Sequence, residues 1–306
     1  MGTFWPIALG SVFLAILWHT LAPRYQESRA ERLLQRGRDR QAALQLEALC
    51  KSWVKRDGEN SLQAASAAAT LARIRFLQGA TEAGLVCLNR AAKSVYAYKG
   101  RPTRRLVVAL LRLGQAALAA QRYSEAAVIG EKALALAGRV LYGADPSLAA
   151  LEAMLGDAHA GLSLFEEAHA HYDRALEIYR LNAGNDSPDA AVVMAAMAAA
   201  MVGEERWKEA RETGLEAVEI LDQQDSVRLP EALSALAELH ARRGRFAEAE
   251  GLRLSICHLW EKLGGPDSAL LAREYERRAE LLKSMERQTE AGYLLGKADS
   301  IRRAVA

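Results

Sequence analysis

Two stretches of the chain carry the same pattern: LGQAALAAQRYSEAAVIGEKALAL at Leu113–Leu136 and LGDAHAGLSLFEEAHAHYDRALEIY at Leu155–Tyr179. In each stretch a glycine is followed, 12 residues later, by an alanine that ends the phrase SEA or EEA. Small residues let two helices approach to about 8 Å, so this spacing predicts two antiparallel helices in close contact. The two stretches lie 42 residues apart, which predicts a repeated helix pair.

The same register extends over most of the chain. The small residue of the second helix recurs every 42 residues from Ala42 to Ala210, with Gly84 as one member, and returns at Ala249 and Ala291. The position 12 residues earlier is always alanine or glycine: Ala30, Ala72, Gly114, Gly156, Ala198, Ala237 and Ala279. Aromatic residues that can fill the wedge between successive pairs are Tyr123, Phe165, Trp207 and Phe246. The pattern therefore predicts an all-α solenoid of about seven helix pairs.

These residues resemble the tetratricopeptide repeat (TPR) family, and more narrowly the 42-residue repeats of kinesin light chains. The linkers LYGADPS, LNAGNDSPD and LGGPDS match too, because glycine follows a long second helix and proline stands near the start of the next helix. The resemblance implies a right-handed superhelix whose concave surface binds proteins.

Two specialised binding modes of that family are not expected here. Kinesin light chains typically carry asparagine two or three residues before the small residue of the first helix. This chain has other residues at these positions: Leu111 and Arg112, Ala153 and Met154, Ala195 and Ala196, and Ser234 and Ala235. Chaperone-binding repeats clamp a carboxylate with asparagine and lysine. The residues that directly follow the small residue are mostly acidic or neutral: Glu31, Arg73, Gln115, Asp157, Ala199, Glu238 and Glu280.

The N-terminal segment FWPIALGSVFLAILWHTLA, at Phe4–Ala22, has no charge that is fixed at pH 7. As a helix its 19 residues would span about 28 Å, close to the thickness of a bilayer core. A cleaved signal peptide is the alternative, but no basic residue precedes the apolar run and Pro23 follows the candidate cleavage site. The sequence therefore predicts a transmembrane helix. Small residues on one face of it, where another membrane helix could pack, are Ala8, Ser11 and Ala15.

Arginines follow this segment, whereas only the α-amino group precedes it. The positive-inside rule then places the N-terminus outside and the solenoid on the cytoplasmic side, as a single-pass membrane protein. A periplasmic solenoid or one in an organelle lumen is the alternative, since a large domain can override the rule. The predicted division is an anchor at 1–23, a juxtamembrane region with a degenerate first helix pair at 24–60, and the solenoid at 61–306.

One first helix is apolar on every face: AAVVMAAMAAAMVG at residues 190–203. A helix of this kind is normally buried all round, yet one of its faces should line the groove. Either a partner or another part of this chain covers it, or its alanines are small enough to face water. The predicted partner groove comprises Leu111, Gln115, Leu118, Ala153, Asp157, Ala160, Ala195, Ala199, Val202 and Glu238.

Motifs for chemistry are absent from the sequence. His169 and His171 are two residues apart and point to different sides of a helix. There is no phosphate-binding loop and no nucleophile elbow. The net charge of +2 gives no indication of nucleic acid. We expect no enzyme, cofactor or metal, and protein partners through the groove. The predicted function is a membrane-anchored adaptor or accessory subunit of a membrane complex, or alternatively a membrane-tethered receptor for soluble peptide or protein ligands in import or assembly.

Overall fold

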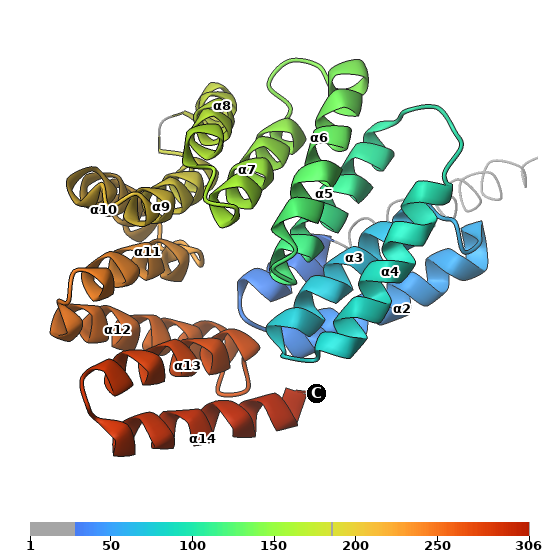
Figure 1. Ribbon diagram of the computed structural model, residues 1–306. Coiled ribbons are helices and arrows are strands. Elements are labelled where there is room, and N and C mark those ends of the chain that lie inside the picture. The colour runs from blue at the N-terminus through green and yellow to red at the C-terminus, as the bar shows by residue number, and fades with distance from the viewer. Residues whose placement is uncertain (1–27, 185, 306) are drawn as a thin grey trace, which may run out of the picture.

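The computed structural model describes residues 28–184 and 186–305, and this part of the chain folds into helices without a β-strand. Each helix pair consists of a first helix and an antiparallel second helix, and the pairs follow one another in a curved row (Figure 1). The first helices are residues 28–35, α3 (Leu62–Leu77), α5 (Arg104–Ala119), α7 (Pro146–Gly161), α9 (Pro188–Gly203), α11 (Leu229–Arg242) and α13 (Ala269–Ser284). The second helices are α2 (Asp39–Asp57), α4 (Thr81–Ala97), α6 (Tyr123–Val140), α8 (Phe165–Ala183), α10 (Trp207–Gln223), α12 (Phe246–Gly264) and α14 (Gln288–Val305).

The small residues of the repeat are buried where the two helices of each pair cross, as predicted. This holds for both positions in every pair, from Ala30 with Ala42 to Ala279 with Ala291. At Gly156 even a methyl group has no room, because an added Cβ would lie 2.5 Å from Cε1 of Tyr172. The 42-residue pattern therefore marks the closest contacts of the backbone.

The turn inside each pair uses a left-handed residue five positions before the small residue of the second helix. The φ angles at these positions lie between 58° and 77°, for Gly37, Gly79, Gln121, Ser163, Glu205, Gly244 and Glu286. In the second pair the N–H of Gly79 then donates to the carbonyl of Phe76 at 3.1 Å. The left-handed residue ends the first helix and reverses the chain within a few residues.

Aromatic residues at the start of second helices fill the wedge to the next pair, as predicted. The Tyr123 ring occupies the space where Gly161, the last residue of α7, would carry a Cβ. Phe165 occupies the corresponding space at Gly203, the last residue of α9. Each contact joins the second helix of one pair to the first helix of the following pair.

The first and last pairs meet, so the row of helices closes on itself. Figure 1 shows α13 and α14 returning beneath α2, α3 and α4. Nη1 of Arg302, in α14, donates to the carbonyl of Leu77 at the end of α3 at 3.2 Å. Gly37 lies against Gly264, where the Gly37 carbonyl leaves no room for a Cβ. The groove that the repeats predict is therefore the lumen of a closed superhelix.

No membrane-spanning helix exists among residues 28–184 and 186–305. The most apolar helix there, α9, has 16 residues and a length of about 24 Å, short of the roughly 30 Å that a bilayer core requires. On this finding the predicted localisation, a single-pass membrane protein with a cytoplasmic solenoid, is wrong. The predicted anchor at 1–23, with its contact residues Ala8, Ser11 and Ala15, lies outside the described residues.

Candidate binding lumen

A cavity of about 730 Å³ lies on the inner face of the superhelix. Its walls come from four consecutive first helices, α7, α9, α11 and α13, together with Phe246 and Arg253 of α12. Ligand pockets in proteins typically have volumes of about 300 to 1,000 Å³, so this cavity is large enough for a small molecule or a short stretch of polypeptide.

The predicted groove residues divide into two groups. Asp157, Ala195, Ala199 and Glu238 line the cavity. The other six do not: Leu111 and Val202 are buried in the core, and Gln115, Leu118, Ala153 and Ala160 are partly buried elsewhere. The structure thus brings together one predicted residue of α7, two of α9 and one of α11, and leaves the remaining predicted residues of α7 and α9 and all those of α5 outside the cavity.

The residue that directly follows the small residue of each first helix points to the inner face. We call this set the inner ladder: Glu31, Arg73, Gln115, Asp157, Ala199, Glu238 and Glu280. The last four members line the cavity. The first three contact one another, because Arg73 donates to Gln115 at 3.4 Å and lies 4.0 Å from a carboxylate oxygen of Glu31. One register position therefore runs along the whole inner surface.

Arg73 and Arg112 share the carboxylate of Glu31 at the N-terminal end of this ladder. Arg112 approaches Glu31 to 2.5 Å, and both arginines also donate to Gln115. Burial lowers the pKa of Arg73, and the neighbouring charge of Arg112 lowers it further. These contacts form a compact polar cluster at this end of the inner surface.

The apolar helix α9 is covered mostly by this chain itself. It packs against α8, α10 and α11, which bury nine of its residues, including Val193 and Met194. Val192, Ala196 and Ala199 are not buried, and together with the buried Ala195 they form a strip that is one wall of the cavity. Within the strip, Ala199 is exposed to the lumen.

Opposite this wall, arginines are held in ion pairs. Nη1 of Arg253 donates to Glu274 at 3.0 Å, and Nη2 lies 3.7 Å from Glu238. Arg277 donates to the Ser234 hydroxyl at 3.0 Å and lies 3.7 Å from Glu274. Burial lowers the pKa of Arg277, as do the charges of other arginines. The network fixes the orientation of α11, α12 and α13 around the cavity.

Asp157 faces the lumen from α7. Its Oδ1 accepts a hydrogen bond of 2.9 Å from the Tyr172 hydroxyl. Asp157 is exposed to the lumen and lines the cavity. Desolvation within the lumen raises the pKa of Asp157 to about 6; the Tyr172 hydrogen bond opposes the rise and the charge of Glu231 adds to it.

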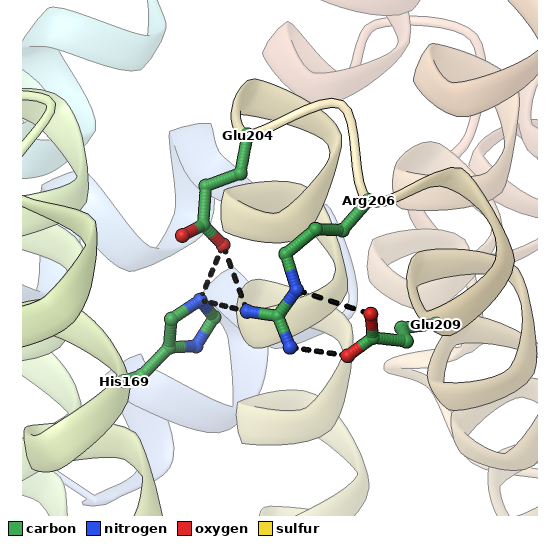
Figure 2. A network of polar contacts seen from close by, with 4 residues as sticks. All are labelled: His169, Glu204, Arg206 and Glu209. Carbon is green, nitrogen blue, oxygen red and sulfur yellow. Dashed lines mark hydrogen bonds and ion pairs between the residues drawn. The ribbon is translucent and has the colours of Figure 1, made fainter.

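A second polar network holds the turn between α9 and α10 against α8 (Figure 2). Nε2 of His169 lies 2.7 Å from Glu204 Oε2, which also accepts a hydrogen bond of 3.1 Å from Arg206. Arg206 bonds Glu209 on its other side. Burial disfavours the charged form of Glu204, but the bonds from His169 and Arg206 outweigh it and lower the pKa of Glu204. The network anchors the end of the helix that forms the apolar wall.

Sequence reasoning missed several residues of the cavity. Glu280 could have been found, because it occupies the same register position as Asp157 and Glu238. Arg253 gave no such signal, since it lies on a second helix and reaches the lumen only through the arrangement of α12.

Comparison with known proteins agrees with this architecture. Residues 147–223 match the family model described as tetratricopeptide repeat. No curated protein matches the sequence of this chain at a significant level.

Solved structures share the fold at low sequence identity. A Rap protein complexed with competence and sporulation factor is 13% identical, with 92% of this chain and 75% of that chain covered and a TM-score of 0.62. The apo form of RapI is also 13% identical, with coverages of 92% and 98% and a TM-score of 0.56. Aspartyl phosphate phosphatase F from Bacillus subtilis is 11% identical, with coverages of 84% and 75% and a TM-score of 0.50. At these identities the likeness concerns the fold alone. The chain thus folds as an all-helical solenoid, and its residues 147–223 are similar to tetratricopeptide repeats.

Proposed function

We propose that this protein is an interaction scaffold that holds a segment of a partner polypeptide in its lumen. The cavity of about 730 Å³ carries the proposal, because it combines an apolar wall with a polar one. The strip on α9 can bury aliphatic side chains, while Ser234, Glu238 and Glu280 offer hydrogen-bonding groups. An extended polypeptide presents both kinds of surface along its length.

The shape of the site favours a linear segment over a folded surface. The lining residues come from four successive helix pairs, so contacts are distributed along the row of repeats. The contacts between α3 and α14 close the superhelix, so the lumen admits only a narrow ligand. A receptor for a peptide or for an extended segment of a soluble protein therefore fits better than a permanent subunit docked through a broad interface.

The comparison with solved structures adds support at the level of fold. One structure of TM-score 0.62 was determined as a complex with competence and sporulation factor, which shows that a superhelix of this kind can hold a ligand. For the present chain the lining of the lumen supports a polypeptide ligand.

The test uses random dodecapeptides displayed on phage and selected on the full chain. Selected peptides are synthesised with a fluorophore, and their Kd is measured by anisotropy. Ala199→Trp places an indole in the exposed gap of the cavity wall, and its matched control, Ala170→Trp, adds the same indole at an exposed position of α8 outside the cavity.

We expect Ala199→Trp to raise the Kd about tenfold or more, and Ala170→Trp to leave it unchanged. Circular dichroism of both variants checks that the helices are retained. The proposal is overturned if selection enriches no peptide over an unrelated helical protein, or if folded Ala199→Trp binds as tightly as the wild type.

A further inference from the structure

We infer that the segment held in the lumen carries a basic side chain, arginine or lysine, that lies over Ala199 and pairs with the carboxylate of Asp157. This inference rests on the proposed function and specifies the chemistry of the ligand. We base it on which charged residues around the cavity are paired and on the order of residues along the inner ladder.

Two carboxylates of the lining lack a cation. Among the described residues, neither Asp157 nor Glu280 has an ion-pair partner. Asp157 accepts only the neutral Tyr172 hydroxyl. At the other end of the ladder, by contrast, Glu31 lies between two arginines. The inner-ladder carboxylate Glu31 is thus paired with arginines, whereas the inner-ladder carboxylates Asp157 and Glu280 in the cavity are not.

The arginines of the cavity cannot supply this missing charge, because they are already engaged. Nε of Arg242 bonds Glu238 at 2.9 Å. Arg253 pairs with Glu274 at 3.0 Å and is only 6% exposed, so its guanidinium is not free to turn toward a ligand. Arg277 is held by Ser234 and Glu274. A cation that meets Asp157 must therefore come from the ligand.

The inner ladder leaves space for that cation beside Asp157. Going from α7 to α11, its members are Asp157, Ala199 and Glu238, so a methyl group stands between two carboxylates. Ala199 is exposed, which leaves the volume above it open. Glu231, from α11, also lines this region and adds negative charge near Asp157.

Both parts of a long basic side chain, the flexible stem and the charged end, match this gap. The methylene stem of lysine or arginine can lie along the apolar strip of Ala195, Ala196 and Ala199, while the charged end reaches the carboxylate. Charge-assisted hydrogen bonds of this kind are about twice as strong as neutral ones. The raised pKa of Asp157 is consistent with a carboxylate that has no counter-ion.

The experiment compares matched peptides on matched proteins. From the selected dodecapeptides, each arginine is replaced in turn by citrulline, which keeps the shape of the side chain but carries no charge. Kd values are measured on the full-length wild type and on Asp157→Asn/Glu280→Gln, in which both unpaired carboxylates become amides. Asp173→Asn/Glu177→Gln is the control, because it removes the same two charges from exposed positions of α8.

We expect one citrulline replacement to raise the Kd about tenfold on the wild type and on the control. On Asp157→Asn/Glu280→Gln, the arginine and citrulline peptides should bind alike. The asparagine can still accept the Tyr172 hydrogen bond, so this variant keeps its local structure.

Two results would overturn the inference. In one, every citrulline peptide binds the wild type as tightly as its parent while Ala199→Trp still blocks binding, so the lumen is the site but charge does not select the ligand. In the other, the preference for arginine survives in Asp157→Asn/Glu280→Gln, and the cation is recognised elsewhere. If no peptide is selected at all, the proposed function fails together with the inference.

Discussion

Asp39 caps a helix that begins 230 residues further along the chain: its Oδ1 accepts a hydrogen bond of 3.0 Å from the backbone N–H of Ala269, the first residue of α13. The other oxygen, Oδ2, accepts a hydrogen bond of 3.1 Å from Nε2 of Gln78. Asp39, Gln78 and Ser268 are each at most 2% exposed to solvent. Ser268 stands at the N-cap of α13 but its side chain does not cap the helix. The first helix pair thus provides the cap that the last pair lacks.

Asp39→Ala should loosen the closure of the superhelix. It removes the cap of α13 and leaves the buried amide of Gln78 without its acceptor, so we expect a loss of about 2–3 kcal/mol in the free energy of unfolding. The radius of gyration from small-angle X-ray scattering should rise. Asp145→Ala is the control, because Asp145 caps α7 within its own pair; it should cost about 1 kcal/mol and leave the radius of gyration unchanged. Equal radii for all three proteins would contradict a capping contact that holds the ends together.

Two glycines should respond to alanine with opposite signs. Neither Gly244 nor Gly251 has an atom within 4 Å of an added Cβ, so sterics do not distinguish them. Gly244 has φ of +70° in the turn before α12, where alanine costs about 1 kcal/mol. Gly251 lies inside α12, where alanine stabilises by about 0.5–1 kcal/mol. Urea unfolding of both variants measures the difference, and a change of the same sign in both would refute the role of the left-handed turn.

The stability of Asp157→Asn relative to the wild type should depend on pH. The folded-state pKa of Asp157 is raised from 3.8 to about 6, so folding favours the protonated carboxyl. Its stabilising contribution is complete below pH 3.8 and is lost as the pH rises through about 6. Asp157→Asn should therefore gain stability over the wild type between pH 4 and pH 7 and keep that gain at higher pH. Free energies of unfolding in urea across this range test the sign, and a gain that shrinks with rising pH would contradict it.

Glu204 and Glu209 both bond Arg206, but they should contribute differently to the free energy of unfolding. Glu204→Gln breaks the network with His169 and Arg206 at a site where the carboxylate side chain is 20% exposed, and should cost about 0.5–1.5 kcal/mol near neutral pH. Because the pKa of Glu204 is lowered in the folded state, this contribution holds above the ordinary value of 4.5 and is lost as the pH falls below it. Glu209→Gln should have the smaller effect, since Glu209 lies at the surface. Thermal unfolding at pH 7 compares them; a larger loss in Glu209→Gln would exclude the proposed anchoring of α9.

The fold was largely predictable because close helix packing leaves a strict trace in the sequence. Only alanine or glycine fits where backbones nearly touch, so positions such as Gly156 and Ala168 recur with the period of the repeat. The turns left a weaker trace: Ser163 and Glu205 adopt the same left-handed conformation as Gly79, although they are not glycine.

The closure of the superhelix could not be predicted from the sequence, because it depends on the sum of small rotations between successive helix pairs. Asp39 and Arg302 look like ordinary charged residues of a helix surface until the ends of the row are brought together. Of the predicted groove residues, four from α7, α9 and α11 line the cavity, whereas Leu111 of α5 packs into the core. The position of a cavity follows from global curvature, which a repeat pattern alone does not specify.

Photo-crosslinking of a selected peptide that carries a benzophenone at its centre tests directly whether the lumen holds a polypeptide segment. After irradiation with the full chain, the attached residues are located by proteolysis and mass spectrometry. We expect adducts on the inner face, at or beside Ala196, Ala199 and Leu281, which all line the cavity. Adducts confined to the second helices α8, α10 or α14 would contradict this expectation and place the binding surface on the outside of the superhelix.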